Sequence, residues 1–528
     1  MALGKSPAAL VVAIGIFLSR IAGLVRDRVF AYYLGNSVAA GAFRAALRIP
    51  NFLQNLFGEG VLSASFIPVY ARLRAEGQDK EAVHLAGAIG ALLGCSVTLL
   101  AGIGILAAPW IIDVLAPGFD APAVRDLTVH LVQIMFPGVA LLVMSAWCLG
   151  VLNSHRHFLL SYIAPVLWNA AIICALLWSG SRNPMTDVGQ TDIAIDVAWG
   201  TIVGCALQFL VQLPLVLRLT RGLRLVPSSK SSAVRTVLRN FLPVLTSRGV
   251  VQISAYIDGV IASFLGPAVY AAMAYAQTLY LLPISLFGMS ISAAELPAMS
   301  SVIGSEEVVK EQLRKKLVSG LKRVSFFVVP SVVAMALLGE VVIATVYQTG
   351  QFKHADVMSG WLILAGSTIG LLASTQGRLC STAFYAMRDS RTPLYFACIR
   401  VLLTAVTGYL LALPVRSALG LSSTIGAAFL TGSAGLAGWV EFLMLRRALS
   451  KKIGAFAVAT TLQIQLWAAA TFSGTVGFAL KLALPEMYPI LTGLIVLGVY
   501  GLLYLGVTTA FGFGEGLAIR QALMRHRR

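Results

Sequence analysis

Fourteen apolar stretches recur along this sequence, and each is long enough to cross a lipid bilayer as a helix. A membrane-crossing helix needs about 20 mostly apolar residues. The chain is 58% hydrophobic and 12% charged, whereas soluble domains carry about 25% charged residues. The sequence therefore predicts an all-α polytopic membrane protein. Its fourteen predicted transmembrane helices lie at residues 8–34, 38–69, 83–108, 127–151, 157–179, 193–217, 240–265, 267–298, 320–346, 357–386, 392–414, 421–445, 455–482 and 487–513.

The basic residues are distributed unequally between the two sides of the predicted membrane. If the amino terminus lies in the cytoplasm, 27 of the 40 Lys and Arg residues fall on the cytoplasmic side, five on the opposite side and eight within the spans. This asymmetry follows the positive-inside rule and predicts that both termini are cytoplasmic. The net charge of +18 is therefore interpreted as topology signals and contacts with membrane lipids, and not as a nucleic-acid-binding surface.

The sequence also contains an internal repeat with an offset near 230 residues. SRIAGLVRDRVFAYYLG at 19–35 corresponds to SRGVVQISAYIDGVIASFLG at 247–266. Two further pairs keep the same order: LFG at 56–58 and 286–288, and the loops around Arg156 and Arg388. Two halves of six spans each point the same way, and parallel repeats are typical of transporters that open alternately to either side.

The duplication predicts the domain organisation. We expect a first six-helix lobe at 1–225 and a second at 226–450, followed by two additional spans and a basic cytoplasmic tail at 451–528.

Eight arginines lie within the predicted spans, where each charge costs about 2.5–3.5 kcal/mol if it faces lipid. Most of them must therefore face protein or water. They are Arg20, Arg26, Arg28, Arg44, Arg48, Arg248, Arg378 and Arg400.

The second span shows how these cations could form a site. Arg44, Arg48 and Asn51 follow a helical period and share one face, with Glu59 drifting slowly off it. In the first span, Arg20 and Arg26 lie near Asp27, and in the seventh span Arg248 lies where the repeat of Arg20 would place it. The candidate substrate-binding site therefore consists of Arg20, Arg26, Asp27, Arg44, Arg48, Asn51, Glu59 and Arg248. For several other arginines, among them Arg28 and Arg378, contact with headgroups or simple packing is the alternative.

The chemistry of the candidate site favours an anionic ligand and no catalysis. Arginine suits multi-anionic groups, diphosphate above all, because its guanidinium donates paired hydrogen bonds. The sequence has no Walker loop and no nucleophile with a neighbouring base. His155 and His157 lack a third ligand, so no metal site, cofactor or enzyme activity is expected.

Several stretches resemble the MurJ (MviN) lipid II flippases of the MOP exporter superfamily. They include SRIAGLVRDRVFAYYLG, RAALRIPNFLQNLFGEGVLSASFIPVYARL, YLLPISLFGMSISAAELP and FYAMRDSRTPLYF, and the resemblance extends to about residue 450. It implies two six-helix lobes, two extra helices that form a groove for an undecaprenyl tail, and residence in the bacterial cytoplasmic membrane. The cavity arginines of the family correspond to Arg20 and Arg26, and its RIPN and EG elements to 48–51 and 59–60.

The chain departs from this family pattern at several positions. The family usually has Asp at Gly41, Arg at Gln54 and Arg at Thr278, and an Asn of the eleventh span is lost near Gly408. A sodium site built from that span and Asp258 is therefore not expected. The cavity loses two arginines but also contains Arg44 and Arg248, so we hypothesise that Arg248 replaces the missing arginine of the eighth span as a diphosphate ligand.

The resemblance and the buried cations lead to the same functional expectation. We expect a flippase that moves lipid II, an undecaprenyl-diphosphate-linked peptidoglycan precursor, across the cytoplasmic membrane by alternating access, as a monomer. Two alternatives stay open: export of another polyprenyl-diphosphate-linked oligosaccharide, and a degenerate paralogue that does not transport. A cationic drug is a poor substrate because the site is rich in arginine.

Overall fold

The described part of the chain is predominantly helical. The computed structural model describes residues 7–57, 59–228, 231–301 and 305–517, with the backbone alone at 7–13, 59, 60, 63, 242–244, 246–255 and 298. Among these residues the only β-type pairing is a bridge between Thr349 and Phe352. The predicted all-α membrane fold is confirmed.

Eleven helices of the described chain are long and apolar enough to cross a membrane. They coincide with the third to sixth and the eighth to fourteenth predicted spans. The other predicted spans fall on α1 (Pro7–Leu34), on α2 (Val38–Phe57) with the helices after it, and on α10 (Ser232–Ser263). These three segments carry six of the eight predicted intramembrane arginines, which lowers their hydropathy. The total of fourteen spans stays a prediction.

The helices form two compact units, which we describe separately. The first contains residues 1–271 together with Thr349–Phe352, and the second contains the rest of the chain. The division falls within α11 (Pro267–Pro283), and therefore α10 packs with the first unit. The predicted lobes at 1–225 and 226–450 stay a prediction.

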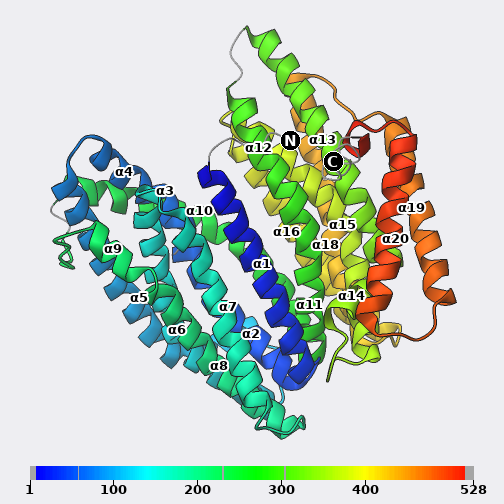
Figure 1. The fold of residues 1–528 in the computed structure, drawn as a ribbon, viewed down its shortest axis with the longest axis horizontal. Coiled ribbons are helices and arrows are strands. Elements are labelled where there is room, and N and C mark those ends of the chain that lie inside the picture. Colours follow the sequence, from blue (N-terminus) through cyan, green and yellow to red (C-terminus); the bar gives the residue numbers. More distant parts are fainter. Residues whose placement is uncertain (1–6, 58, 229–230, 302–304, 518–528) are drawn as a thin grey trace, which may run out of the picture. The chain divides into compact units, whose positions relative to one another are not determined.

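In the first unit, long helices run side by side around α6 (Figure 1). This helix packs on α2, α5 and α8, while α7 lies between α1 and α8. Besides α1, α2 and α10, the helices are α3 (Glu59–Ser65), α4 (Ile67–Ala75), α5 (Asp79–Leu115), α6 (Pro122–Ser154), α7 (Phe158–Gly180), α8 (Asp187–Leu210) and α9 (Leu213–Leu219).

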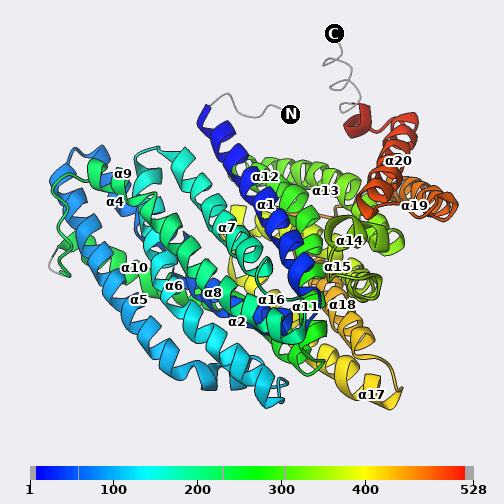
Figure 2. The same ribbon diagram turned by 60° about the horizontal axis from the view of Figure 1, so that its bottom comes forward.

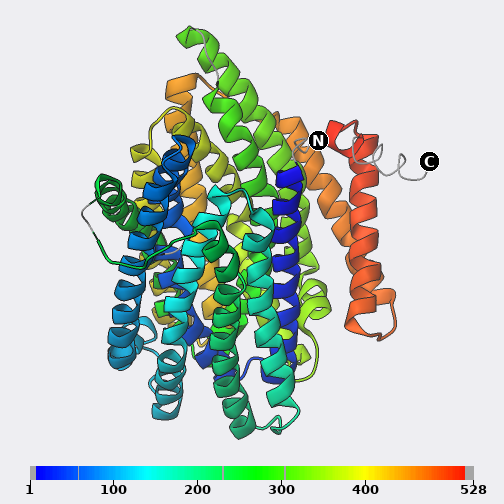
Figure 3. The same cartoon turned by 60° about the vertical axis from the view of Figure 1, so that its left-hand side comes forward.

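In the second unit, α15 and α18 pack along their lengths, with α13 and α16 beside them. The last two long helices, α19 and α20, lie side by side, as Figures 2 and 3 show. Beyond α11, the helices are α12 (Ser290–Ser300), α13 (Glu306–Leu337), α14 (Gly339–Tyr347), α15 (His354–Ala386), α16 (Arg391–Leu410), α17 (Arg416–Ala418), α18 (Ser423–Ile453), α19 (Thr460–Ala483) and α20 (Pro489–Ala510).

The predicted second span is not one helix. A turn at Phe66 separates α3 from α4, and Pro50 lies inside α2. Its repeat at 267–298 is also irregular, because a π-helical turn at Ile284–Met289 separates α11 from α12. The π-helical turn contains the second LFG motif. Such interruptions are tolerated at membrane depth where protein or water covers the freed backbone groups.

Backbone dihedral angles preserve the internal repeat. Arg156 and Arg388 are the only described residues other than glycine with positive φ, at 62° and 59°. Left-handed backbone is unfavourable for a residue with a Cβ, so its recurrence at equivalent positions supports duplication. Two glycine pairs with positive φ have nearly the same spacing: Gly35 with Gly266, and Gly222 with Gly454.

The two loops with left-handed arginines differ in their chemistry. In the first, burial lowers the pKa of His155 to about 4, and the charge of Arg74 contributes. In the second, the hydrogen bond from Lys452 to Asp389 lowers the pKa of that carboxyl to about 2. Asp389 also accepts a hydrogen bond from the backbone N–H of Thr392, 3.1 Å away, in the first turn of α16. The repeat therefore preserves the turn but not its side-chain interactions.

Close packing in the first unit explains the glycine at position 41. A Cβ placed on Gly41 would lie 2.2 Å from the carbonyl oxygen of Pro267. Because the obstacle is backbone, it cannot move aside as a flexible side chain can. The aspartate usual in the related family would therefore not fit between α2 and the start of α11 in this conformation.

We predict that Gly41→Ala destabilises the protein through this contact. Overpacking of this kind typically costs about 1–3 kcal/mol, so the melting temperature in detergent should fall. Gly23→Ala in α1 is the matched control, because a Cβ there meets nothing within 4 Å, and alanine favours a helix. An unchanged melting temperature for Gly41→Ala would contradict the tight approach.

Candidate functional site

Two arginines from successive helices share the carboxylate of Asp27. In α1, the Nη2 of Arg26 lies 2.9 Å from Oδ1 of Asp27, and in α2 the Nη2 of Arg44 lies 3.1 Å from the same oxygen. The side chain of Asp27 is only 2% exposed. An isolated buried carboxylate would be very unfavourable, so the two guanidinium groups are what allow Asp27 to be ionised here.

Aromatic rings cover both guanidinium groups. Arg44 lies over the ring of Phe30, with its Cζ 4.5 Å from the ring centroid, and Arg26 lies 5.1 Å from the Trp168 ring. Phe30 itself packs on Phe43, one residue before Arg44. Cation–π contacts of this kind strengthen when water is excluded. The cluster of Arg26, Asp27 and Arg44 is therefore a compact ionic group with a formal charge of +1.

Arg48 lies one turn after Arg44 in α2 and has different partners. Its Nη1 donates to the hydroxyl oxygen of Tyr270 at 3.1 Å, and the hydroxyl of Tyr256 donates to its backbone carbonyl at 2.8 Å. The guanidinium also lies over the Tyr256 ring, 5.3 Å from the centroid. Tyrosines of α10 and α11 thus hold both ends of Arg48.

Gly259 makes room for the Arg48 guanidinium. A Cβ on Gly259 would lie 2.3 Å from Nη1 of Arg48. Gly259 and Tyr256 are three residues apart in α10 and share one face of that helix. This face of α10 is shaped to receive the arginine of α2.

Little free space remains around Arg48. The cavity beside it has a volume of about 10 Å³ and is bounded by Ala45, Tyr256, Gly259 and Tyr270, with three apolar residues of α5 and its end. A single water molecule needs about 10–15 Å³. On this side, Arg48 has no room for a ligand as large as a diphosphate.

Of the other predicted site residues, Arg20 and Asn51 do not join these two groups. Arg20 is exposed and has no hydrogen-bond or ion-pair partner among the described residues, and Asn51 is half-buried. The side chains of Glu59 and Arg248 lie outside the described part of the chain. The structure therefore brings together Arg26, Asp27 and Arg44 directly.

Sequence reasoning missed the two tyrosines and Gly259. Their signal was weak, because a tyrosine in an apolar helix is an ordinary packing residue, and their importance depends on α10 packing against α2. The sequence analysis also placed Arg44 and Arg48 on one ligand-binding face of a helix, whereas the structure gives them separate partners. Thr278, where the family usually has arginine, donates to the carbonyl oxygen of Ala274 in its own helix at 3.1 Å.

The arrangement suits anion binding better than metal binding. Within the described ranges, no three His, Cys, Asp or Glu side chains gather closely enough to hold a metal ion. A dry cluster with more guanidinium groups than carboxylates can donate several charge-assisted hydrogen bonds to phosphate oxygens.

We predict that Asp27→Asn destabilises the protein strongly. It leaves two largely buried cations without their counter-ion, and breaking a buried pair typically costs about 3–5 kcal/mol. The matched control is Asp113→Asn, which removes an exposed partner of Arg125 and should leave the melting temperature unchanged. Equal melting temperatures for Asp27→Asn and the parent would show that Asp27 does not hold the cluster.

Comparisons with known proteins identify a family whose members resemble this chain in sequence. The family model described as "Lipid II flippase MurJ" matches residues 30–498. The chain is 29% identical to the lipid II flippase MurJ of Burkholderia cenocepacia, over 78% of each protein. It is 30% identical to a probable lipid II flippase MurJ of Rhizobium meliloti, over 81% of this chain and 77% of that relative.

Solved structures show the same fold. One described as "Lipid II flippase MurJ, inward closed conformation" covers 95% of this chain and 98% of its own, with a TM-score of 0.77 and 23% identity. An inward-facing multidrug transporter of the MATE family in the MOP superfamily has a TM-score of 0.61 and 17% identity, over 85% of this chain and 97% of its own. The family match along most of the chain and the 30% identical relative establish that this protein belongs to the lipid II flippase MurJ family.

Proposed function

We propose that this protein moves lipid II, the undecaprenyl-diphosphate-linked peptidoglycan precursor, across the bacterial cytoplasmic membrane. The observation that carries the proposal is the buried cluster of Arg26, Asp27 and Arg44, in a chain whose family is named for lipid II flipping. Arginine pairs match the geometry and charge of a diphosphate. The same cluster disfavours cationic cargo.

Asp27 pairs with the arginines of the cluster when no cargo is bound. In the empty protein its carboxylate accepts from both arginines, so neither cation is left unpaired in a dry environment. A diphosphate offers more oxygens and more negative charge than one carboxylate. Cargo binding is then an exchange of hydrogen-bond partners, with Arg26 turning from Asp27 toward phosphate and Arg20 and Arg48 contributing further donors.

Arg48 provides a contact that depends on conformation. The space beside it admits about one water molecule, so a phosphate reaches this side of the guanidinium only after Tyr256 or Tyr270 moves. A carrier changes state when its ligand binds one state more tightly than the other. Opening the contact between α2 and α10 would expose Arg48 in only one of the two states.

The parallel repeat supports alternating access as the mechanism. We assign the lobes to 1–225 and 226–450, with 451–528 as additional spans and tail, and place both termini in the cytoplasm because of the basic loops. A membrane potential that is negative inside would favour return of an empty, positively charged site toward the cytoplasm, by about 2.3 kcal/mol per charge per 100 mV. The protein acts as a monomer and transports without catalysis.

Complementation tests the proposal. A host is depleted of its own flippase, this chain is expressed, and growth is measured together with the fraction of lipid II accessible to an externally added degrading enzyme. We expect restored growth and restored accessibility. Correct membrane insertion without either would count against lipid II as the cargo.

We predict that Gly259→Ala impairs transport by displacing Arg48. The added methyl carbon would lie only 2.3 Å from Nη1 and so push the guanidinium aside. Loss of a charge-assisted contact should lower lipid II accessibility about tenfold, as Arg48→Ala should. Gly23→Ala serves as the control for glycine replacement in a helix of the same unit. If Gly259→Ala supports parental transport while Arg48→Ala does not, the glycine is not what positions the arginine.

The hypothesis about Arg248 generates a separate prediction. We expect Arg20→Ala and Arg248→Ala each to abolish complementation, and Arg248→Ala combined with Thr278→Arg to regain part of it, with expression verified by blotting. The physical reason is that the second change restores the arginine usual in the eighth span. Parental growth of Arg248→Ala beside a dead Arg20→Ala would refute the compensation.

A further inference from the structure

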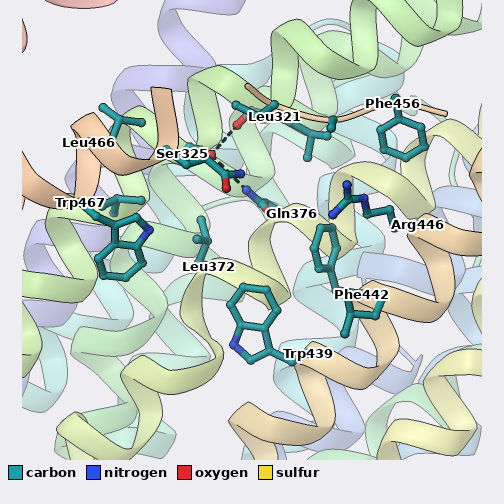
Figure 4. A pocket seen from close by; sticks show the side chains of 15 residues that line it. Leu321, Ser325, Leu372, Gln376, Trp439, Phe442, Arg446, Phe456, Leu466 and Trp467 are labelled. Carbon is teal, nitrogen blue, oxygen red and sulfur yellow. Dashed lines mark hydrogen bonds between the residues drawn. The ribbon is translucent and has the colours of Figure 1, made fainter. Parts of the chain in front are cut away.

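A cavity of about 170 Å³ lies within the second unit, between four helices and a connecting segment. Its walls come from α13, α15, α18, the start of α19 and the segment that joins the last two, at residues 454–459. Figure 4 shows the side chains that line it. The volume exceeds that of a single water site by about tenfold, so the cavity can admit part of an organic molecule.

One wall of this cavity is polar although it is deeply buried. Gln376 is 4% exposed and Ser325 is 1% exposed. The Nε2 of Gln376 donates to Oγ of Ser325 at 3.0 Å, and this hydroxyl donates to the carbonyl of Leu321 at 2.9 Å. Among the described residues the second N–H of the Gln376 amide and its carbonyl oxygen have no hydrogen-bond partner. A buried amide with unused capacity at a cavity wall indicates a polar guest.

The remaining walls are apolar and aromatic. Phe442 and Phe456 are nearly buried, whereas Trp467 is 38% exposed. Figure 4 shows Trp467 and Arg446 on opposite sides of the cavity. Tryptophan is enriched where a membrane meets water, because its ring is apolar and its N–H is polar.

Arg446 supplies a positive charge to the lining. It is exposed, and no carboxylate lies within 4 Å of its guanidinium in the described part of the chain. Trp439, Phe442 and Arg446 recur at helical spacing and so present one side of α18 to the cavity. The cation therefore lines a cavity that also offers an amide, a hydroxyl and apolar side chains.

We propose that this cavity binds an anionic glycerophospholipid from the surrounding membrane. The phosphate lies at Arg446, an ester oxygen accepts a hydrogen bond from an amide N–H of Gln376 or Gln463, and the first part of an acyl chain follows Leu372 and Trp467. A hydrocarbon chain alone would leave the polar wall unsatisfied. A cationic amphiphile would be repelled by Arg446, and a free inorganic anion would not use the aromatic wall.

This inference is independent of the proposed transport reaction. All lining residues belong to the second unit, whereas Arg26, Asp27, Arg44 and Arg48 belong to the first. A lipid that binds only the folded protein stabilises it by mass action. The site would therefore make the stability of the second unit depend on the headgroup charge of the membrane.

The test measures lipid binding to the full-length protein without any transport assay. Purified protein in detergent is titrated with phosphatidylglycerol or phosphatidylcholine, and bound lipid is counted by native mass spectrometry. We expect phosphatidylglycerol to bind more tightly, and Arg446→Ala to weaken it about tenfold, as loss of a charge-assisted hydrogen bond does. Arg447→Ala is the matched control, because this neighbour is exposed and does not line the cavity.

Further variants locate the bound lipid. Arg446→Lys should retain part of the affinity, and Gln376→Leu should weaken binding even if Arg446→Ala fails to fold. Phosphatidylglycerol brominated on its acyl chain should quench tryptophan fluorescence in the parent and less in Trp467→Phe.

Three results would each overturn the proposal. The first is equal affinity for both lipids, and the second is an equal loss in Arg446→Ala and Arg447→Ala. The third is tighter binding of undecaprenyl phosphate that displaces phosphatidylglycerol, since the cavity would then belong to the cargo. Failure of complementation would leave all these binding measurements unaffected.

Discussion

In the first unit, charged side chains that are buried away from water need partners within the protein. Asp27 is held by Arg26 and Arg44, and both cations lie against aromatic rings. Desolvation penalises each isolated charge, so the carboxylate and the guanidinium groups depend on one another. A transporter for an anion must present cations to its cargo and still tolerate them when the cargo is gone. An internal carboxylate that substitutes for phosphate meets both requirements.

Arg48 meets the same constraint in a different way. It donates to the Tyr270 hydroxyl and lies over the Tyr256 ring, while Gly259 leaves room for it. The hydroxyls of two neutral tyrosines bond with Arg48, and Asp258 lies near enough to act on its charge. The cluster at Asp27 and Arg48 therefore differ in their partners: direct ion pairs hold the first, and tyrosine hydroxyls contact the second.

Much of the fold could be predicted because its causes are local in the sequence. Apolar stretches of sufficient length predicted helices, and repeated motifs predicted equivalent loops that share a left-handed arginine. The partners of the arginines were not predictable in the same way, because period alone places Arg44 and Arg48 on one face without saying what packs there. That depends on contacts such as Tyr256 with Arg48, which join residues 208 positions apart.

The charges on α1 and α2 also have a consequence for biogenesis. Helices enter the membrane from the translating ribosome in order, and α1 arrives with Asp27 before Arg44 has been synthesised. Charged residues make such a segment insert poorly by itself. The ion pair between Asp27 and Arg44 and the contact of Phe30 with Phe43 would stabilise the two helices if they enter the membrane together as a hairpin. The interaction that prepares the protein for its cargo would then also assist the nascent chain in leaving the insertion machinery.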